Sequence, residues 1–141
     1  MIGFDIKQLF FDKPAVINAV DRATRKVLSK FGAFVRTTAR HSIRKRKQPA
    51  PPGKPPSSHT GLLKKFIYFG YDPSKRSVVI GPVRLSERGR GELPGAPPLL
   101  EYGGTRKVGK KVAFYKARPF MGPAFENEKP QLPAMWASSV K

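Results

Sequence analysis

Few side chains in this chain are suited to acid–base or nucleophilic chemistry. It contains two histidines, His41 and His59, together with nine Asp or Glu and no cysteine. His59 directly precedes Thr60, which places a base beside a hydroxyl nucleophile. Adjacent residues in a loop rarely align for such a reaction, so we expect His59 to anchor its loop instead. His41 lies among arginines, which disfavour additional positive charge on its ring.

Metal and phosphate sites have no clear sequence pattern either. A zinc site usually needs three or four ligands, and no second histidine stands at ligand spacing from His41. The short glycine-containing segments 52–54 (PGK) and 89–91 (GRG) lack the spacing of a phosphate-binding loop. We therefore expect no catalytic residues, no metal ligands, no cofactor and no enzymatic activity. An enzyme for an anionic substrate remains an alternative only if His41 or His59 proves essential to turnover.

Positive charge is the strongest compositional signal. The chain has 28 Lys and Arg against 9 Asp and Glu, a formal net charge of +19. Residues 22–54 contain no acid, which predicts one strongly positive flank that favours nucleic acid or an acidic protein surface. The run 44–47 (RKRK) also suits a solvated helix end, where cations complement the helix dipole. Any phosphate contact there would be independent of sequence. The residues that we expect to face DNA or a partner are Arg36, Arg40, Arg44, Lys45, Arg46 and Lys47.

The length and apolar pattern indicate one domain. A chain of 141 residues can bury one core. We expect no signal peptide, because the N-terminus carries aspartates, and no membrane contact, because no apolar run approaches a span of about 20 residues. The absence of cysteine excludes disulfides and leaves the redox compartment open.

A long basic helix is predicted over residues 13–47, with its helical turns reaching about residue 46. Asp12 is a suitable N-cap and Pro14 is tolerated in the first turn. Gly32 would allow a bend at a cost near 1 kcal/mol relative to alanine. Residues 1–12 ahead of the helix form an N-terminal arm. The apolar positions at spacings of three or four are Val16, Val20, Ala23, Val27, Phe31, Phe34, Val35 and Thr38.

A proline-rich loop over residues 48–60 follows the helix, because proline removes an amide donor and restricts the residue before it. Its residues 57–60 (SSHT) offer helix caps for a short helix at about 61–66. Strands at 66–71 and 77–82, joined by a turn, predict a β-hairpin. The aromatic residues of its first strand suit base stacking, but they share a run with Ile67 and we expect them to pack in the core or an interface.

The rest of the sheet region, 61–128, contains a long loop at 83–98 without periodicity. A short helix ended by glycine follows at 98–104, and a strand within 108–115 is expected to return to the sheet. A helical segment opens at 118–124, and residues 129–141 form a C-terminal tail. The predicted fold class is α+β. It has an antiparallel sheet of about three to five strands, the long basic helix on one face and a short C-terminal helix.

Three separated motifs occur in a fixed order along this chain. They are 52–56 (PGKPP) followed by 60–63 (TGLL), then 79–82 (VIGP) with 100–105 (LEYGGT), then 117–124 (ARPFMGPA). Together with the basic helix, they resemble the family of small tail-component proteins of long-tailed bacteriophages. These are the neck or tail-completion proteins encoded beside the head–tail connectors. The resemblance covers about residues 15–128.

The resemblance implies a structural virion protein, assembled in the host cytoplasm, that forms a ring in the neck and completes the tail. Six-fold rings are favoured and twelve-fold rings are possible. The implied partners are the head–tail connector or adaptor, the tail-tube or terminator proteins, and the genomic DNA through nonspecific contact. Tail completion, tail termination and a head-side stopper role all remain open.

Apolar side chains near both termini suit contacts between subunits, because exposed apolar surface usually marks an interaction site. The segments 49–59 and 83–98 are expected to contact adjacent rings. The alternative function is that of a sequence-nonspecific, basic nucleic-acid-binding protein. The expected subunit-interface residues are Phe4, Phe10, Phe11, Pro52, Pro55, Pro56 and Trp136.

Overall fold

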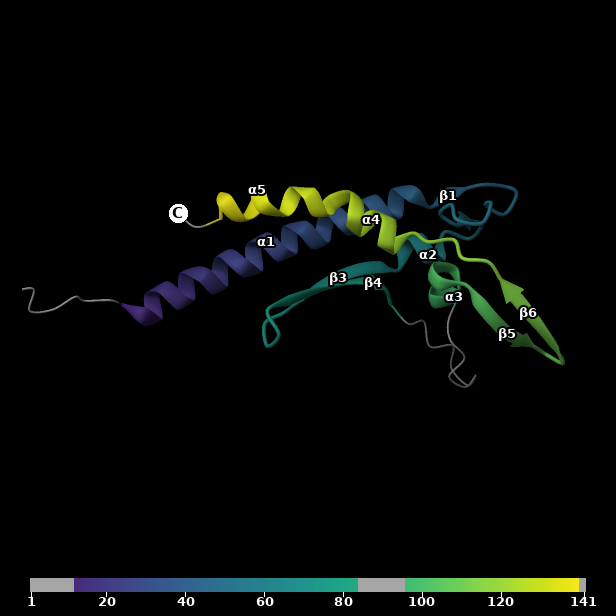
Figure 1. Ribbon diagram of the computed structural model, residues 1–141, viewed down its shortest axis with the longest axis horizontal. Helices are drawn as coiled ribbons and strands as arrows, with labels where there is room; N and C mark the ends of the chain where they lie inside the picture. Colours follow the sequence, from purple (N-terminus) through teal and green to yellow (C-terminus); the bar gives the residue numbers. More distant parts are fainter. Residues whose placement is uncertain (1–11, 84–95, 140–141) are drawn as a thin grey trace, which may run out of the picture.

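The computed structural model describes residues 12–83 and 96–139. In these ranges, the long helix α1 runs along the molecule, with the C-terminal helices beside it and a β-hairpin on another side (Figure 1). The predicted arm 1–12, with Phe4, Phe10 and Phe11, and the loop 83–98 lie almost wholly outside the described residues. The elements are α1 Lys13–Ser42, β1 Arg44–Lys45, β2 Ser57–Ser58, α2 Leu62–Lys65, β3 Ile67–Asp72, β4 Ser77–Pro82, α3 Ala96–Tyr102, β5 Gly104–Val108, β6 Lys111–Tyr115, α4 Met121–Glu128, the 3-10 helix η1 Lys129–Gln131 and α5 Leu132–Ala137.

Helix α1 begins as predicted. The Asp12 side chain accepts a hydrogen bond from the Ala15 amide at 3.0 Å, and a proline stands in the first turn. The central part of the apolar stripe is buried at Ala23, Val27, Phe31 and Val35. Three other members of the predicted stripe, Val16, Val20 and Phe34, are exposed.

The end of α1 differs from the prediction, because the helix stops at Ser42 and not at residues 46–47. Ile43 turns extended, with φ −82° and ψ 105°, and its side chain is 1% exposed. Arg44 and Lys45 then pair in parallel with Ser57 and Ser58. Burial of the Ile43 side chain contributes about 2 kcal/mol, whereas another helical turn would bring like charges to neighbouring positions. The basic run therefore lies beyond the helix.

The predicted hairpin of β3 and β4 is confirmed, with Ile67 opposite Pro82 and Asp72 opposite Ser77. The Asp72 carboxylate stabilises the turn by accepting hydrogen bonds from the Ser74 hydroxyl at 2.6 Å and the Ser74 amide at 2.9 Å. The hydroxyl bond is the main reason why the pKa of Asp72 lies below its ordinary value.

Gly32 lies where α1 meets this hairpin. A Cβ atom at Gly32 would stand 2.8 Å from Cγ2 of Val78 and 3.0 Å from Cδ2 of Phe69. Close approach between the helix and the hairpin therefore requires glycine here, a role different from the bend suggested by the sequence.

We expect Gly32→Ala to lower the free energy of unfolding by about 1 kcal/mol. The overpacking cost of about 1–3 kcal/mol exceeds the gain of about 1 kcal/mol in helix propensity. Urea unfolding followed by circular dichroism measures the difference. Gly70→Ala is the control, because nothing lies within 4 Å of a Cβ at Gly70. A more stable Gly32→Ala variant would contradict the close packing.

The α+β class is confirmed, but the strands do not join into one sheet of three to five strands. Within residues 12–83 and 96–139 they form three two-stranded sheets: β1–β2, β3–β4 and β5–β6. The strand expected to return to the sheet at 108–115 instead pairs with Gly104–Val108. Gly109, with φ +62°, provides the left-handed conformation at the tip that a tight turn between neighbouring strands requires.

The predicted short helices are confirmed. Helix α2 occupies Leu62–Lys65. Helix α3 ends at Tyr102 and is followed by Gly103, which has φ +73° and donates its amide to the Leu99 carbonyl at 2.9 Å. In the region 129–141, which was predicted as a tail, η1 and α5 continue the line of α4, with Pro130 and Pro133 in the first turns where proline is tolerated.

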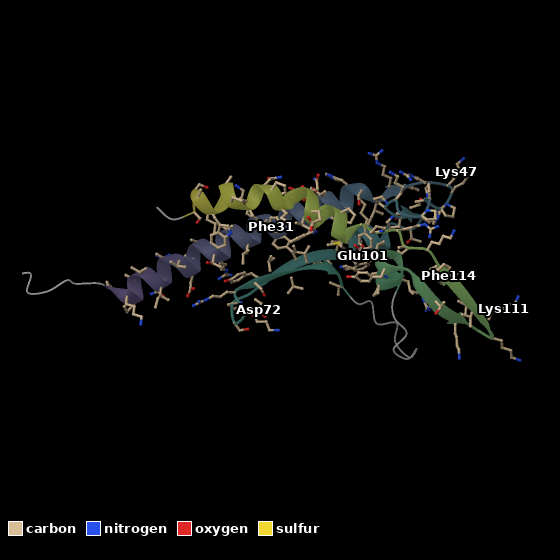
Figure 2. The ribbon with its side chains drawn as sticks, in the orientation of Figure 1. Phe31, Lys47, Asp72, Glu101, Lys111 and Phe114 are labelled. Atoms are coloured by element: carbon tan, nitrogen blue, oxygen red, sulfur yellow. The ribbon has the colours of Figure 1, made fainter. Side chains whose placement is uncertain are left out.

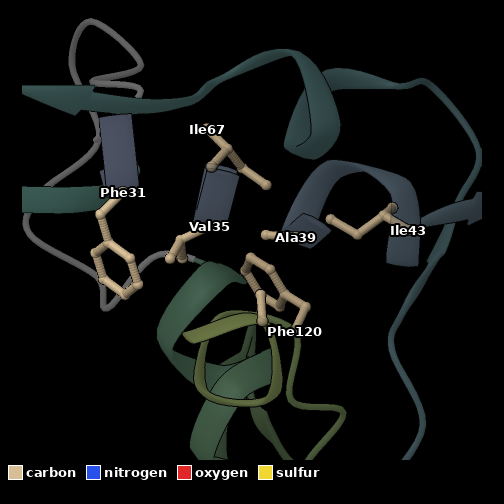
Figure 3. Packing of buried hydrophobic residues seen from close by; sticks show 7 residues of the cluster. Phe31, Val35, Ala39, Ile43, Ile67 and Phe120 are labelled. Carbon is tan, nitrogen blue, oxygen red and sulfur yellow. The ribbon is translucent and has the colours of Figure 1, made fainter. Parts of the chain in front are cut away.

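The core lies where α1, the start of β3 and α4 meet (Figure 3). Leu132 and Met135 of the C-terminal helices pack against it. No helix in the described part of the chain is both long enough and apolar enough to cross a membrane. The buried cluster consists of Phe31, Val35, Ala39, Ile43, Ile67, Phe120 and Ala124.

Candidate functional site

The second and third sequence motifs meet at the start of α4. The two carboxylate oxygens of Glu101 accept hydrogen bonds from the backbone amides of Phe120 at 2.8 Å, Met121 at 3.0 Å and Gly122 at 2.7 Å. A Cβ at Gly122 would lie 3.1 Å from a Glu101 oxygen. A negative group at a helix N-terminus satisfies free amides and complements the helix dipole. Glu101 therefore caps α4 from α3 (Figure 2).

The first motif joins the same junction from the proline-rich loop. The Gly53 amide donates to the Ala117 carbonyl at 2.9 Å, and Nε of Arg118 donates to the Ala50 carbonyl at 2.7 Å. The Arg118 amide also donates to the Leu100 carbonyl. The segments 52–56, 100–105 and 117–124, one from each motif, are thus connected by hydrogen bonds, and we name this set of contacts the motif junction.

No local sequence pattern indicates this junction. A capping box is recognisable because its acid follows the cap by three residues, whereas Glu101 precedes Phe120 by 19 residues. The side chains of Glu101 and Arg118 form hydrogen bonds with backbone groups, so the role that the junction's geometry supports is to hold these segments in place.

A second polar contact ties α4 to α1. The Glu128 side chain is 7% exposed and accepts hydrogen bonds from the Thr38 hydroxyl and from Nε2 of Gln131, the latter at 2.6 Å. Thr38 belongs to the predicted apolar stripe, but its hydroxyl donates a hydrogen bond to this carboxylate. A buried carboxylate is tolerated because its oxygens have hydrogen-bond donors.

The histidines occupy separate environments. His41, with Arg40, Thr37 and Lys64, lines a polar hollow of about 290 Å³. The Thr37 hydroxyl donates to the Ala33 carbonyl at 2.8 Å, so it is occupied within its own helix.

His59 is exposed in the turn before α2. Its neighbours hold that turn: the Ser58 hydroxyl accepts from the Gly61 amide at 2.9 Å and the Thr60 hydroxyl from the Leu62 amide at 3.4 Å. Across the two described ranges, no group of three or more His, Cys, Asp or Glu side chains is placed to hold a metal ion.

The basic residues named from the sequence divide into two groups. Nε of Arg36 donates to the Ile67 carbonyl at 2.8 Å, and its guanidinium lies 5.6 Å from the centre of the Tyr68 ring. Arg36 therefore holds β3 against α1 and is not presented freely to a partner. Arg40 is half-buried at the polar hollow. The four residues 44–47 are all exposed.

The exposed run 44–47 shares one end of the molecule with the β5–β6 hairpin, as the positions of Lys47 and Lys111 show (Figure 2). Residues 102–125 contain no acid, so the hairpin is as free of negative charge as the helix flank. We define the cationic end as the residues Arg44, Lys45, Arg46, Lys47, Arg106, Lys107, Lys110, Lys111 and Lys116.

The expected interface residues are unequally accessible. Pro52 is exposed, Pro55 is half-buried and Pro56 is buried. Trp136 lies on α5 and is 39% exposed. Burial of Pro56 removes it from the set that can contact a neighbouring subunit. Larger apolar exposure occurs at places not named from the sequence, above all at Tyr102, Phe114, Val79 and Val112.

Comparisons with protein-family models, with curated proteins and with solved structures found no match for this chain. The functional conclusion therefore depends on the motifs, the exposed surfaces and the charge distribution described above.

Proposed function

We propose that this protein is a structural component of a tailed bacteriophage, forming a homo-oligomeric ring in the neck that completes the tail and joins it to the capsid connector. The observation that supports the proposal most is the motif junction. One segment from each of the three motifs that together resemble the tail-completion family takes part in it, through Glu101, Gly53 and Arg118. The segments that carry the resemblance therefore meet in one part of the fold, which supports reading them together.

Exposed apolar side chains support assembly. At the N-terminal part of α1, Val16, Ile17 and Val20 are each more than 40% exposed, and Trp136 is 39% exposed on α5. Apolar groups gathered on a surface usually mark protein contacts. A head-to-tail contact between different surfaces of identical subunits closes into a ring when its rotation allows.

Electron microscopy of the purified full-length protein, alone and mixed with connector or tail-tube protein, tests the proposal. We expect closed rings, six-fold in preference to twelve-fold. Native mass spectrometry gives the subunit number independently. Monodisperse monomers under all these conditions would contradict the ring.

Sequence-nonspecific nucleic-acid binding is the second candidate function, and the cationic end favours it. A salt titration of duplex-DNA binding separates the candidates. Tight binding with a steep negative slope of log affinity against log salt, without ring formation, would support this alternative. Ring formation with weak DNA binding would oppose it.

A further inference from the structure

The β5–β6 hairpin extends away from the body of the molecule as a two-stranded ribbon (Figure 1). Its register places Thr105 opposite Phe114 and Lys107 opposite Val112, so these four side chains share one face. Phe114 is 70% exposed and Val112 is 64% exposed. An isolated two-stranded ribbon is marginally stable in water, and a partner on its open face would add buried surface.

The ribbon carries cations along its length and at its tip. Residues 102–125 include no acid. The motif junction fixes the ribbon relative to the basic run 44–47. Gly53 lies in the segment after the basic run and Arg118 in the segment after the ribbon, and their hydrogen bonds join these two segments. Two exposed cationic segments, far apart in sequence, therefore lie at the same end of the molecule (Figure 2).

The charges decide which partner this surface fits. A second copy of the chain would need to offer a compensating acidic surface. In the described part of the chain, Asp21 is paired with Arg76 at 3.1 Å, Glu101 caps α4 and Glu128 is buried. The other described acids are engaged as well, since Asp12 caps α1, Asp72 holds its turn and Glu126 pairs with Lys129, so the described part of a second copy offers no free acidic surface to this ribbon. The described acids are Asp12, Asp21, Asp72, Glu101, Glu126 and Glu128.

We propose that the β5–β6 ribbon and the run 44–47 form one binding surface for the sugar–phosphate backbone of nucleic acid. Lys107, which shares the face of Phe114, and Lys110 and Lys111, at the tip of the hairpin, contact phosphates, and Phe114 contacts exposed bases or sugars. Lysine neutralises phosphate and releases counterions, while an exposed aromatic ring stacks on bases regardless of their identity. The assignment goes beyond ring formation and does not depend on it, because genomic DNA and free nucleic acid offer the same backbone.

The test compares two triple variants of the full-length chain that lose the same charge. One is Lys107→Gln, Lys110→Gln and Lys111→Gln. The matched control is Arg22→Gln, Arg25→Gln and Lys26→Gln, three exposed cations on α1. Fluorescence anisotropy with labelled duplex and single-stranded DNA measures affinity over a range of salt concentrations, and circular dichroism checks folding.

We expect the ribbon variant to lose affinity on the order of 100-fold at 0.1 M salt. Its log–log salt slope for duplex DNA should become shallower by about 2.7, because three phosphate contacts contribute about 0.9 each. The control should lose less than about fivefold, since charges beyond roughly 10 Å are screened at this salt. Equal losses in the two variants, or no measurable binding by the unmodified protein, would overturn the proposal.

The variant Phe114→Ala separates bases from a second copy as the occupant of the apolar face. We expect single-strand affinity to fall about fivefold or more, with a smaller change for duplex, whose bases are already stacked. If Phe114→Ala abolishes self-association and leaves nucleic-acid binding unchanged, the face belongs to another subunit and the proposal is wrong. Ring formation by the lysine variant is recorded in parallel, so failure of DNA contact is distinguished from failure of assembly.

Discussion

Replacing Phe120 by alanine is expected to lower the free energy of unfolding by about 4 kcal/mol, the largest effect of any single substitution considered for this protein. Phe120 is 1% exposed and is the largest fully buried side chain in the described residues. Its side chain lies next to Ala39 of α1, in the cluster that also contains Ile43 (Figure 3). Alanine would leave a cavity there and lose the transfer free energy of the ring.

Urea unfolding followed by Trp136 fluorescence measures this loss. Phe114→Ala is the matched control, because it removes the same atoms from a side chain that is 70% exposed. We expect the control to change stability by less than about 1 kcal/mol. Equal losses for the two variants would mean that Phe120 is not part of the core.

The substitution Glu101→Ala is expected to lower the free energy of unfolding by about 3 kcal/mol. It removes the acceptor of three backbone amides at the start of α4, those of Phe120, Met121 and Gly122. Because Glu101 belongs both to the cap of α4 and to the motif junction, we expect the whole fold to be destabilised and not α4 alone. A calorimetric melting temperature about 10 °C lower corresponds to this change.

Two variants establish that the cap is responsible. Glu101→Gln keeps one oxygen but places an amide group near a backbone donor, so an intermediate loss is expected. Glu126→Ala should change stability by less than about 0.5 kcal/mol, because its ion pair with Lys129 is exposed and 3.7 Å long. If Glu101→Ala were as mild as Glu126→Ala, the capping role would be wrong.

The amino-acid sequence determined the features that depend on near neighbours. Asp12 and Pro14 mark the start of α1, and the four-residue spacing from Ala23 to Val35 identifies its buried face. The hairpin β3–β4 and the glycine at the end of α3 were recognisable for the same reason. Caps, turns and apolar periods act within a few residues, so a single sequence displays them. The excess of positive charge follows from the composition alone, whatever the fold.

Tertiary structure alone decided how these pieces use their polar groups. The helix ends before Ile43 because the Ile43 side chain is buried in an extended conformation and because another helical turn would bring like charges together. The run 44–47 therefore lies outside α1. Arg36 is bound to β3, and Glu101 caps a helix that starts 19 residues later. The hydrogen bond from Arg118 to Ala50 spans 68 residues. Such contacts follow from where the packed core brings distant segments together, and no local pattern of residues encodes them.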